Sequence, residues 1–564
     1  LGEGTLDISG AGTQVLRSSG ADTGLTISGG NLVLQGKADV DGARLSYGNL
    51  VNSGNLTIQA SDNSLTAVNT TLSVENASFS SGSATTFTLN TDADMTASFI
   101  EISGDVVIED GASFHVTSIP DVNITWKSGN PMELTLMELT GNGTIDLGEN
   151  TLTVGGLFLT YYKNAHLVQE GDKVVLKAEE QTDNIYAGVA DTANSMAGAN
   201  LLWDAARHGS IDQAVTDFLG ALNNNMLNNP SAARRSLAAM AGSTVNALGT
   251  AQRDALRDQM GWIRNRTTLM GVNPAYVNDD LPRFHMWMEG TGSYAKLDTR
   301  GDESGYQLTT WGGTVGVDAD LSDRLTVGAA FTAGYGDLTA SAADSADGHL
   351  DSYYASLFGR YQDRRWAHTL ILTGGWNDAK LNRTVNYGEG SYGTQGSTSG
   401  WGFGAMYELT YDVYLNENRS SVLQPLFNAS VVTTRMDGYE ETGAGNAGLN
   451  VGRQDWTTGT LALGGRWMGL VGSNIFGREA LAEIRVNAAQ DLGDRRGETN
   501  VSLLGNPGFA QSVRGAKVGT TALQLGAGLS VPVGTKGTIY VNGNADIRDG
   551  SSALNGSIGY RYDF

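Results

Sequence analysis

The chain has 564 residues, no cysteine and a formal net charge of −24 at pH 7. The lack of cysteine excludes a disulfide framework and a thiolate metal site, and the negative charge argues against nucleic acid as a partner. No apolar run of about 18 residues occurs, so a membrane-spanning helix is excluded. Since the chain also lacks a starting methionine and a signal segment, we expect a processed or truncated chain.

From residue 1 to about 157, short apolar groups are separated by Gly, Ser, Asn and Thr, as in Leu25-Thr26-Ile27 and Val106-Val107-Ile108. Strands this short cannot form a core alone, but stacked coils can share one. We predict a right-handed parallel β-helix over residues 1–180, with a β-sandwich as the alternative. Its end, at about 141–180, is the most apolar part and is predicted to cap the stack.

Residues 181–282 have a helical pattern rich in Ala, Leu and Met. Pro230 follows Asn229 and is expected to be a first helical residue. Farther on, a helix is predicted at about 243–270, and one side of it is basic. That side carries Arg253, Arg257, Arg264 and Arg266.

From 283 to 564, apolar and polar residues alternate with period two, which is the pattern of strands whose two faces meet different solvents. At the C-terminus, Ile558, Tyr560, Tyr562 and Phe564 alternate with polar residues. About twelve such segments start near Phe284, Gln307, Leu325, Leu350, Trp366, Thr398, Val422, Trp456, Arg478, Val518, Thr538 and Ala553. Strands in lipid cannot leave an edge unpaired, so we predict a twelve-stranded antiparallel transmembrane β-barrel. A soluble all-β domain is the alternative.

The predicted connections alternate in length. Tight turns are expected at 322–324, 362–365, 416–420 and 534–537, and long loops at 339–349, 388–397, 437–455 and 491–516. Short turns on one side and long outer loops on the other are typical of outer-membrane barrels.

The barrel gives the basic helix a location other than a solvated surface or a membrane interface. Inward-facing positions of the strands include acidic residues that could pair with arginines in a confined space. We therefore predict that the helix lies in the lumen. The predicted acidic wall consists of Asp318, Asp320, Glu408, Glu483 and Asp546.

The β-helical segment, the helical linker, the barrel and the terminal Tyr560-Arg561-Tyr562-Asp563-Phe564 together resemble a monomeric autotransporter of type V secretion. The terminal residues Ile558, Tyr560, Tyr562 and Phe564 are similar to the signal read by the barrel-assembly machinery. Many porins share that signal, so it indicates the membrane. The order of passenger, helix and barrel on one chain is what indicates secretion.

The resemblance implies a Gram-negative outer-membrane location with the passenger at the cell surface. It implies periplasmic chaperones and the barrel-assembly (BAM) complex as partners, together with outer-membrane lipid and lipopolysaccharide. It also implies a monomer whose passenger, an adhesin or surface coat, binds a host or cell-surface ligand that the sequence does not identify. Translocation would be driven by passenger folding instead of ATP, since each stacked coil buries apolar surface. No cofactor and no metal are expected.

Some autotransporters cut the linker inside the lumen, by attack of an Asn side chain on its own backbone. Asn223, Asn224 and Asn225 form the Asn run of this linker, but they lie upstream of the predicted lumenal helix. Their surroundings do not match the expected motif. We therefore expect the linker to remain uncut, with these residues forming an Asn-rich helix end.

Enzymatic signals are weak. The six His are scattered, no nucleophile elbow or triad is evident, and the two GxGxxG strings at 388–393 and 443–448 fall in predicted outer loops. The sequence therefore predicts that the chain is not an enzyme. Two alternatives stay open: a channel or porin with an appended domain, and a translocator of an enzyme whose catalytic part lies upstream of Leu1.

Overall fold

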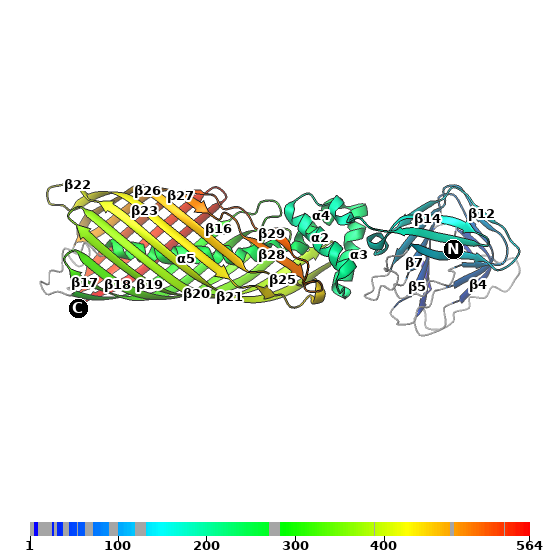
Figure 1. Ribbon diagram of the computed structural model, residues 1–564, viewed down its shortest axis with the longest axis horizontal. Helices are drawn as coiled ribbons and strands as arrows, with labels where there is room; N and C mark the ends of the chain where they lie inside the picture. Colours follow the sequence, from blue (N-terminus) through cyan, green and yellow to red (C-terminus); the bar gives the residue numbers. More distant parts are fainter. Residues whose placement is uncertain are drawn as a thin grey trace. The chain divides into compact units, whose positions relative to one another are not determined.

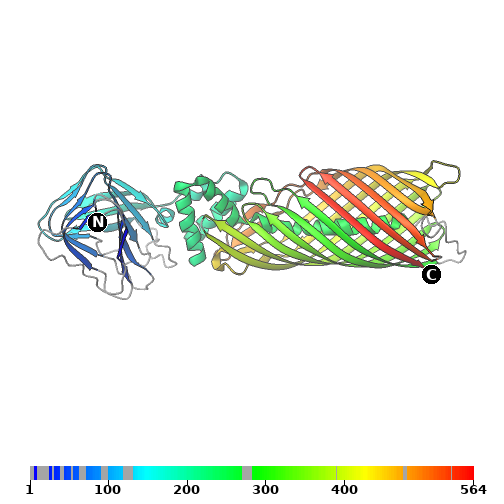
Figure 2. The same cartoon turned by 180° about the vertical axis from the view of Figure 1, so that it is seen from behind.

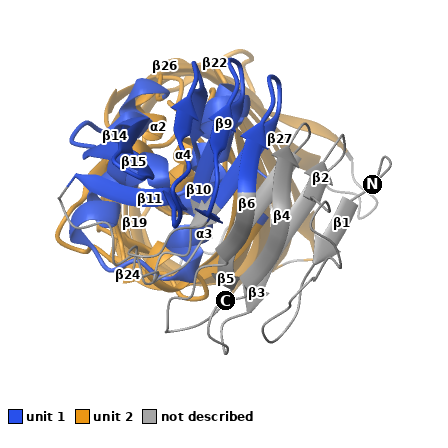
Figure 3. Cartoon of the chain, turned by 90° about the vertical axis from the view of Figure 1, so that its right-hand side faces the viewer, with its two compact units in different colours: residues 1–189, 202–233, 387–390 blue, residues 190–201, 234–386, 391–564 orange. Residues whose placement is uncertain are grey.

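The computed structural model describes residues 5–8, 25–27, 31–37, 44–52, 55–62, 71–89, 100–118, 131–269, 283–388, 390–473, 479–534 and 536–564. The chain divides into two compact units, coloured separately in Figure 3. Unit 1 comprises residues 1–189, 202–233 and 387–390, and unit 2 comprises residues 190–201, 234–386 and 391–564. Within the described ranges, no helix combines the length and the apolar character needed to cross a bilayer.

Unit 1 contains two β-sheets in which most ladders are parallel. The first has the order β1-β3-β5-β7-β10-β13, and the second β12-β9-β6-β8-β11-β15-β14, with β2 and β4 attached through β6. The strands are β1 (Thr5–Ile8), β2 (Leu25–Ile27), β3 (Asn31–Lys37), β4 (Arg44–Asn52), β5 (Asn55–Asp62), β6 (Thr71–Phe79), β7 (Ala84–Leu89), β8 (Ile100–Ile102), β9 (Val106–Ile108), β10 (Ser113–Ser118), β11 (Met132–Leu139), β12 (Ile145–Leu147), β13 (Thr151–Val154), β14 (Tyr162–Glu170) and β15 (Lys173–Glu180).

The ladders of the first sheet bring residues far apart in sequence into register. Asn55 pairs with Ala84, which pairs with Ser113, which in turn pairs with Thr151. Stacked coils require parallel pairing of this kind, so the ladders are compatible with a β-helix. The β-helical passenger itself stays a prediction. The β14–β15 hairpin is antiparallel and joins β11, at the end of the predicted cap.

Apolar side chains of unit 1 meet between the sheets. The ring centroids of Phe79 and Phe114 are 5.4 Å apart, and those of Phe87 and Phe114 are 6.5 Å apart. All three rings are buried, so each short strand contributes only a few side chains to a core shared by many strands.

The linker is helical, as predicted. Helix α4 begins at Pro230. The side chain of Asn229 caps this helix by accepting a hydrogen bond from the backbone N–H of Ala232 at 3.2 Å. Gly242 ends α4 with φ of +75°, a conformation that favours glycine. The helices are α1 (Phe158–Tyr161), η2 (Ile185–Gly188), α2 (Ala193–His208), α3 (Gln213–Asn228), α4 (Pro230–Ala241), η3 (Ser243–Asn246) and α5 (Ala247–Leu269). The predicted linker end at 270–282 lies outside the described residues.

Twelve long strands of the described part of unit 2 close into an antiparallel barrel (Figures 1 and 2). The first strand pairs with the last, β16 with β32, and β21 pairs with β23. The barrel strands are β16 (Arg283–Leu297), β17 (Gly305–Ser322), β18 (Leu325–Ser341), β19 (Ser345–Asp363), β20 (Trp366–Tyr387), β21 (Gly390–Tyr411), β23 (Ser421–Met436), β26 (Gln454–Ser473), β27 (Glu479–Gly493), β30 (Thr521–Val533), β31 (Gly537–Arg548) and β32 (Ser551–Asp563), with β22 (Val413–Tyr414) continuing β21. The twelve-stranded barrel is therefore confirmed.

The two faces of each strand differ as the alternation predicts. On β16, Met286 and Met288 point outward and are 55% and 61% exposed, while Trp287 between them is 2% exposed. On β20, the outward positions run from Trp366 to Trp376 through Leu370 and Leu372. An aromatic residue at each end of an apolar stretch is typical of a strand crossing a bilayer.

Beyond Trp376 the polarity of β20 reverses. The outward residues become polar, beginning with Asp378 and Lys380, and the inward ones become mostly apolar, with Arg383 as the charged exception among Ala379, Leu381 and Val385. The period-two geometry continues, but the outer half of the strand has the pattern of a soluble barrel, with water outside and a packed interior.

Two of the four predicted long loops, at 339–349 and 388–397, are wrong. The β18–β19 connection is only residues 342–344, and β20 ends at residue 387 while β21 begins at residue 390. These segments look like loops in the sequence because their outward residues are polar, yet they remain paired strands that extend past the membrane. The connections at 437–453 and 494–520 are long, as predicted.

The two long connections form a small sheet of their own. Its order is β24-β25-β28-β29, with a short helix η4 (Gly445–Ala447) between its first two strands. The strands are β24 (Tyr439–Glu440), β25 (Leu449–Val451), β28 (Glu498–Leu503) and β29 (Gln511–Arg514). This loop sheet lies at the outer end of the barrel, opposite the short turns (Figure 1).

Candidate functional site in the barrel lumen

Helix α5 lies inside the barrel, where it contacts β16, β17, β18, β19, β23 and β26 (Figure 1). Its apolar side chains Leu256 and Met260 are buried against the wall at positions where the strands carry glycine. A Cβ atom at Gly402 would lie 2.9 Å from Leu256, and one at Gly404 would lie 2.5 Å from Met260. Glycine in the wall therefore makes room for the larger side chains of the helix.

At the turn end of the lumen, Arg266 donates a hydrogen bond to Asp318 at 3.1 Å. The side chains are 2% and 0% exposed, so the ion pair is fully withdrawn from water. His285 Nδ1 lies 2.6 Å from the other oxygen of Asp318. The Arg266 guanidinium also stands over the ring of Trp287, 5.4 Å from its centroid. This cluster fixes the C-terminal end of α5 to β16 and β17.

Farther along the helix, Arg257 donates to Asp491 at 2.8 Å and to Thr460 at 2.6 Å. Arg253 pairs with its own neighbour Asp254 and lies 4.6 Å from the ring centroid of Trp456. Asp491 was not among the predicted wall acids because the sequence places it in a loop, whereas it belongs to β27.

The other predicted wall acids pair mainly with arginines of the wall itself. Glu408 lies 3.1 Å from Arg466, Glu483 lies 3.4 Å from Arg485, and Asp546 lies 2.5 Å from Arg548. Asp320 accepts a hydrogen bond from Thr326 at 2.5 Å and lies 3.6 Å from Arg283.

A signal for two of these wall pairs was present in the sequence. Arg485 and Arg548 each follow an acid by two residues, which places both side chains on the same strand face. A buried carboxylate requires a nearby positive charge whatever the helix does, so the wall supplies its own.

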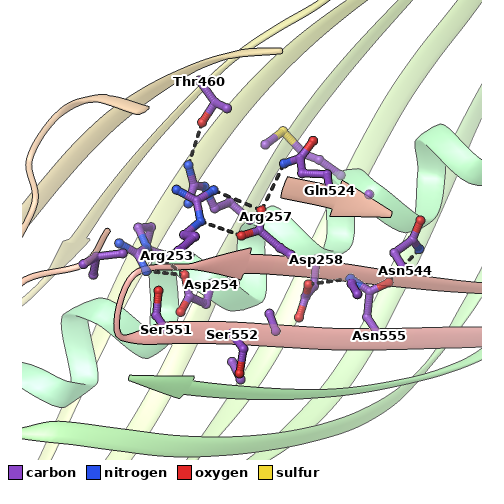
Figure 4. Close-up of a pocket in the computed structure, with 18 of the residues that line it drawn as sticks. Arg253, Asp254, Arg257, Asp258, Thr460, Gln524, Asn544, Ser551, Ser552 and Asn555 are labelled. Atoms are coloured by element: carbon purple, nitrogen blue, oxygen red, sulfur yellow. Dashed lines mark hydrogen bonds and ion pairs between the residues drawn. The ribbon is translucent and has the colours of Figure 1, made fainter. Parts of the chain in front are cut away.

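A cavity of about 140 Å³ remains beside the helix (Figure 4). Asp258 of α5 accepts a hydrogen bond from Asn555 of β32 at 2.9 Å, and Arg264 also lines the cavity. Of the four predicted helix arginines, Arg266 and Arg257 thus reach acids of the wall, while Arg253 pairs within the helix and Arg264 faces the cavity.

At the outer end, a second buried cluster holds the start of the lumenal segment. Arg383 donates to both oxygens of Glu441, at 2.8 and 2.6 Å, and to the carbonyl oxygen of Ala239 at 3.1 Å. Asp344 lies 3.9 Å from Arg383 and accepts a hydrogen bond from Thr244. The turn at 342–344 and the long loop carrying Glu441 are therefore tied to α4 and η3.

This cluster is expected to respond to mild acid. Asp344 lies in a turn outside the membrane, where burial raises its pKa to about 6. Since the folded state keeps a proton there that the unfolded chain has lost, stability should rise by about 1 kcal/mol as pH falls from 7 to 5. The midpoint temperature of the heat-modifiable gel shift, measured at both pH values, should report this rise. In the Asp344→Asn variant the rise should be absent; the same rise in that variant would contradict the assignment.

The Asn run lies in α3 of unit 1 and precedes the lumenal segment in the sequence. Asn223 is fully buried and donates hydrogen bonds to the carbonyl oxygen of Gly156 at 2.6 Å and to the hydroxyl of Thr160 at 2.9 Å. The arrangement gives Asn223 a packing role, and cleavage at Asn223, Asn224 or Asn225 stays a hypothesis without structural support.

The terminal motif lies on the outward face of β32. Ile558, Tyr560, Tyr562 and Phe564 are 60%, 40%, 39% and 58% exposed, and the rings of Tyr562 and Phe564 are 5.2 Å apart. Because β32 closes the barrel against β16, the motif stands at the closing seam. Its role as an assembly signal stays a prediction.

Comparison with known proteins gives three kinds of match. A family model described as autotransporter beta-domain matches residues 286–544. The esterase EstA of Pseudomonas aeruginosa is 30% identical over 218 residues, which are 38% of this chain and 32% of the esterase. An extracellular serine protease of Serratia marcescens is 29% identical over 105 residues, which are 18% of this chain and 10% of the protease. The chain therefore spans about a third of the length of the esterase, and less of the protease.

Among solved structures, the translocator domain of the autotransporter NalP from Neisseria meningitidis has a TM-score of 0.41 at 16% identity. The match covers 57% of this chain and 99% of that domain. The relatives overturn one prediction from the sequence. The expectation that the chain is not an enzyme is wrong, because proteins named as an esterase and a serine protease share part of this sequence.

Proposed function

Because the barrel of this chain is an autotransporter β-domain of the Gram-negative outer membrane, we propose that it carries the N-terminal part of its own chain to the cell surface. We divide the chain accordingly into a passenger at 1–180, a linker at 181–282 and a translocator at 283–564. The proposal rests on one observation above all: helix α5 of the linker lies inside a closed barrel.

The path of the linker supports this direction of transport. At the loop end, the side chain of Gln454 accepts a hydrogen bond from the backbone N–H of Gly249 at 3.0 Å. At the turn end, Arg266 meets Asp318, and β16 begins there beside the short β17–β18 turn. The chain thus crosses the lumen from the side of the long loops to the side of the short turns, and short turns face the periplasm in such barrels.

In this proposal the driving force is passenger folding outside the cell. Each strand added to the parallel ladders of unit 1 buries apolar surface and makes return through the lumen less favourable. The capping region would emerge first and start the stack, while α5 stays behind and fills the pore. Periplasmic chaperones and the BAM complex would deliver the barrel, with the terminal motif as the signal, into a membrane of phospholipid and lipopolysaccharide.

Two kinds of passenger fit this barrel. A stack of short strands suits an adhesin or surface coat that binds a host or cell-surface ligand. The esterase and protease relatives favour a passenger with hydrolase activity instead. Hydrolysis of a p-nitrophenyl ester by intact cells, compared with cells that express the barrel alone, separates the two.

Single-cysteine labelling tests the topology, because the native chain contains no cysteine and gives no background. Asn142→Cys lies on an exposed turn of unit 1, and Asp323→Cys on a short barrel turn where its side chain is 88% exposed. A bulky maleimide reagent should label the first variant in intact cells, and the second only after the outer membrane is permeabilised. Labelling of Asn142→Cys only after permeabilisation would refute surface display.

A further inference from the structure

Two neighbouring short turns of the barrel carry exposed arginines. Arg364 and Arg365 lie between β19 and β20, and Arg419 lies between β22 and β23. The turns lie side by side, since the backbone N–H of Asp412 donates to the carbonyl oxygen of Arg365 at 2.8 Å. Within the residues that the structure describes, none of these three arginines has a carboxylate within 4.0 Å. We call this group the arginine turns.

The acids nearby are mostly engaged elsewhere. Asp363 pairs with Arg324 at 3.3 Å, and Asp412 is buried and accepts hydrogen bonds from Gln362 and Gln424. Glu417 is the remaining exposed carboxylate of the two turns. The net charge of the chain is −24, yet the arginine turns are locally positive. Neutralisation of nearby acids does not account for this positive charge.

Two of the guanidinium groups lie within cation–π distance of the same tyrosine ring. The Arg419 guanidinium lies 5.1 Å from the ring centroid of Tyr414, and the Arg365 guanidinium lies 5.8 Å from it. Cation–π contact stabilises each arginine, but two like charges on one ring repel each other. An anion between them would remove that repulsion and accept hydrogen bonds from both planar groups.

The backbone at these positions is also unusual. Arg364 has φ of +55° and Arg419 has φ of +54°, in the left-handed region that favours glycine or asparagine. Turns of this kind are made more easily without arginine. Arginine at both positions therefore indicates a use for the side chain itself.

The surroundings indicate where the anion would lie. Trp366 is 46% exposed and packs against Tyr411 with ring centroids 4.8 Å apart, and Leu415 is 55% exposed. Exposed aromatic and aliphatic side chains beside arginines mark the height of lipid headgroups, here those of the inner, phospholipid leaflet.

We propose that the arginine turns bind the phosphate of an anionic glycerophospholipid, with the glycerol-linked headgroup between Arg365 and Arg419 and the acyl chains along Trp366 and Leu415. Guanidinium groups recognise phosphate through paired hydrogen bonds, which lysine does not reproduce. This inference rests on the proposed orientation of the short turns toward the periplasm.

Native mass spectrometry of the full chain in detergent, with equal phosphatidylglycerol and phosphatidylethanolamine, tests the proposal. The wild type should retain phosphatidylglycerol about tenfold better than phosphatidylethanolamine, since each arginine near the surface adds to the binding free energy for an anionic lipid. The R364Q/R365Q/R419Q variant should lose this preference. A matched control, R300Q/R435Q/R453Q, removes the same charge from arginines that pair with acids at the loop end, and it should keep the preference.

Heat-modifiable migration on gels verifies that both variants are folded, and if the first is not, the wild-type comparison alone decides. Equal retention of the two lipids by the wild type would overturn the proposal, as would an unchanged preference in R364Q/R365Q/R419Q. Displacement of phosphatidylglycerol by an equal concentration of inorganic phosphate would identify a site for free phosphate instead of lipid. Cross-linking of the turns to a periplasmic protein, without lipid preference, would identify a protein-docking surface and also refute it. Failure of surface display with retained lipid preference would overturn only the proposed function.

Discussion

Replacing Asp318 with alanine is expected to destabilise the folded barrel by about 3–5 kcal/mol, because it leaves a fully buried arginine without its partner. Water cannot solvate the guanidinium of Arg266 in place of the carboxylate, since the side chain is only 2% exposed. His285 loses its shortest carboxylate contact in the same step. The end of α5 should then loosen, and the protein should conduct ions in planar bilayers more than the wild type does.

The double variant Arg266→Met/Asp318→Leu separates charge from packing. Removing both charges together should restore most of the lost stability, since an apolar pair of similar size often replaces a buried ion pair without cost. Asp320→Ala, on the same strand but only weakly paired, serves as the control. The readouts are the midpoint of heat-modifiable migration and the single-channel conductance. Equal midpoints for Asp318→Ala and Asp320→Ala would show that the pair does not hold the helix.

Gly316→Val is expected to prevent correct barrel closure or to cost at least about 1–3 kcal/mol. A Cβ atom at Gly316 would lie 2.2 Å from the ring of Trp287, which is itself buried on the neighbouring strand β16. The ring cannot move outward, because the wall surrounds it, and inward it meets Arg266.

Gly313→Val is the matched control, because Gly313 lies on the same strand and a Cβ there would only approach the carbonyl oxygen of Glu289 at 3.9 Å. The amount of heat-modifiable barrel in outer membranes should fall for Gly316→Val and remain near wild type for Gly313→Val. Adding Trp287→Ala should partly rescue Gly316→Val. Similar losses for both glycine variants would point to the strand backbone instead of the ring contact.

Period-two alternation was sufficient to predict the barrel. Polar inward residues such as Thr373 and apolar outward residues such as Leu372 mark the membrane part of β20, where two solvents act on opposite faces. The segments at 339–349 and 388–397 were read as loops, although they belong largely to the outer ends of β18, β19 and β21, where polar residues face outward. The alternation itself persists there, but its direction depends on the solvent outside, and the sequence does not carry that information by itself.

The lumenal site was predicted less completely. The basic face of α5 and the inward acid Asp318 were enough to predict that the two meet. Which arginine reaches which acid depends on how far the helix is turned and how deep it sits, and both are set by packing at positions such as Gly404. The partner of Arg257 was missed because Asp491 lies near the end of β27, a strand whose true length the sequence does not reveal.

The polarity reversal of β20 also determines how the protein fits its membrane. Ten residue steps separate Trp366 from Trp376, and at about 3.3 Å per step with a tilt of about 40° they rise about 25 Å, the height of the apolar band expected for this class. The strand itself has 22 residues. The height of the apolar outer band and the length of the barrel are therefore set independently. The lumen that encloses α5 can be longer than the bilayer is thick without a hydrophobic mismatch with the lipid.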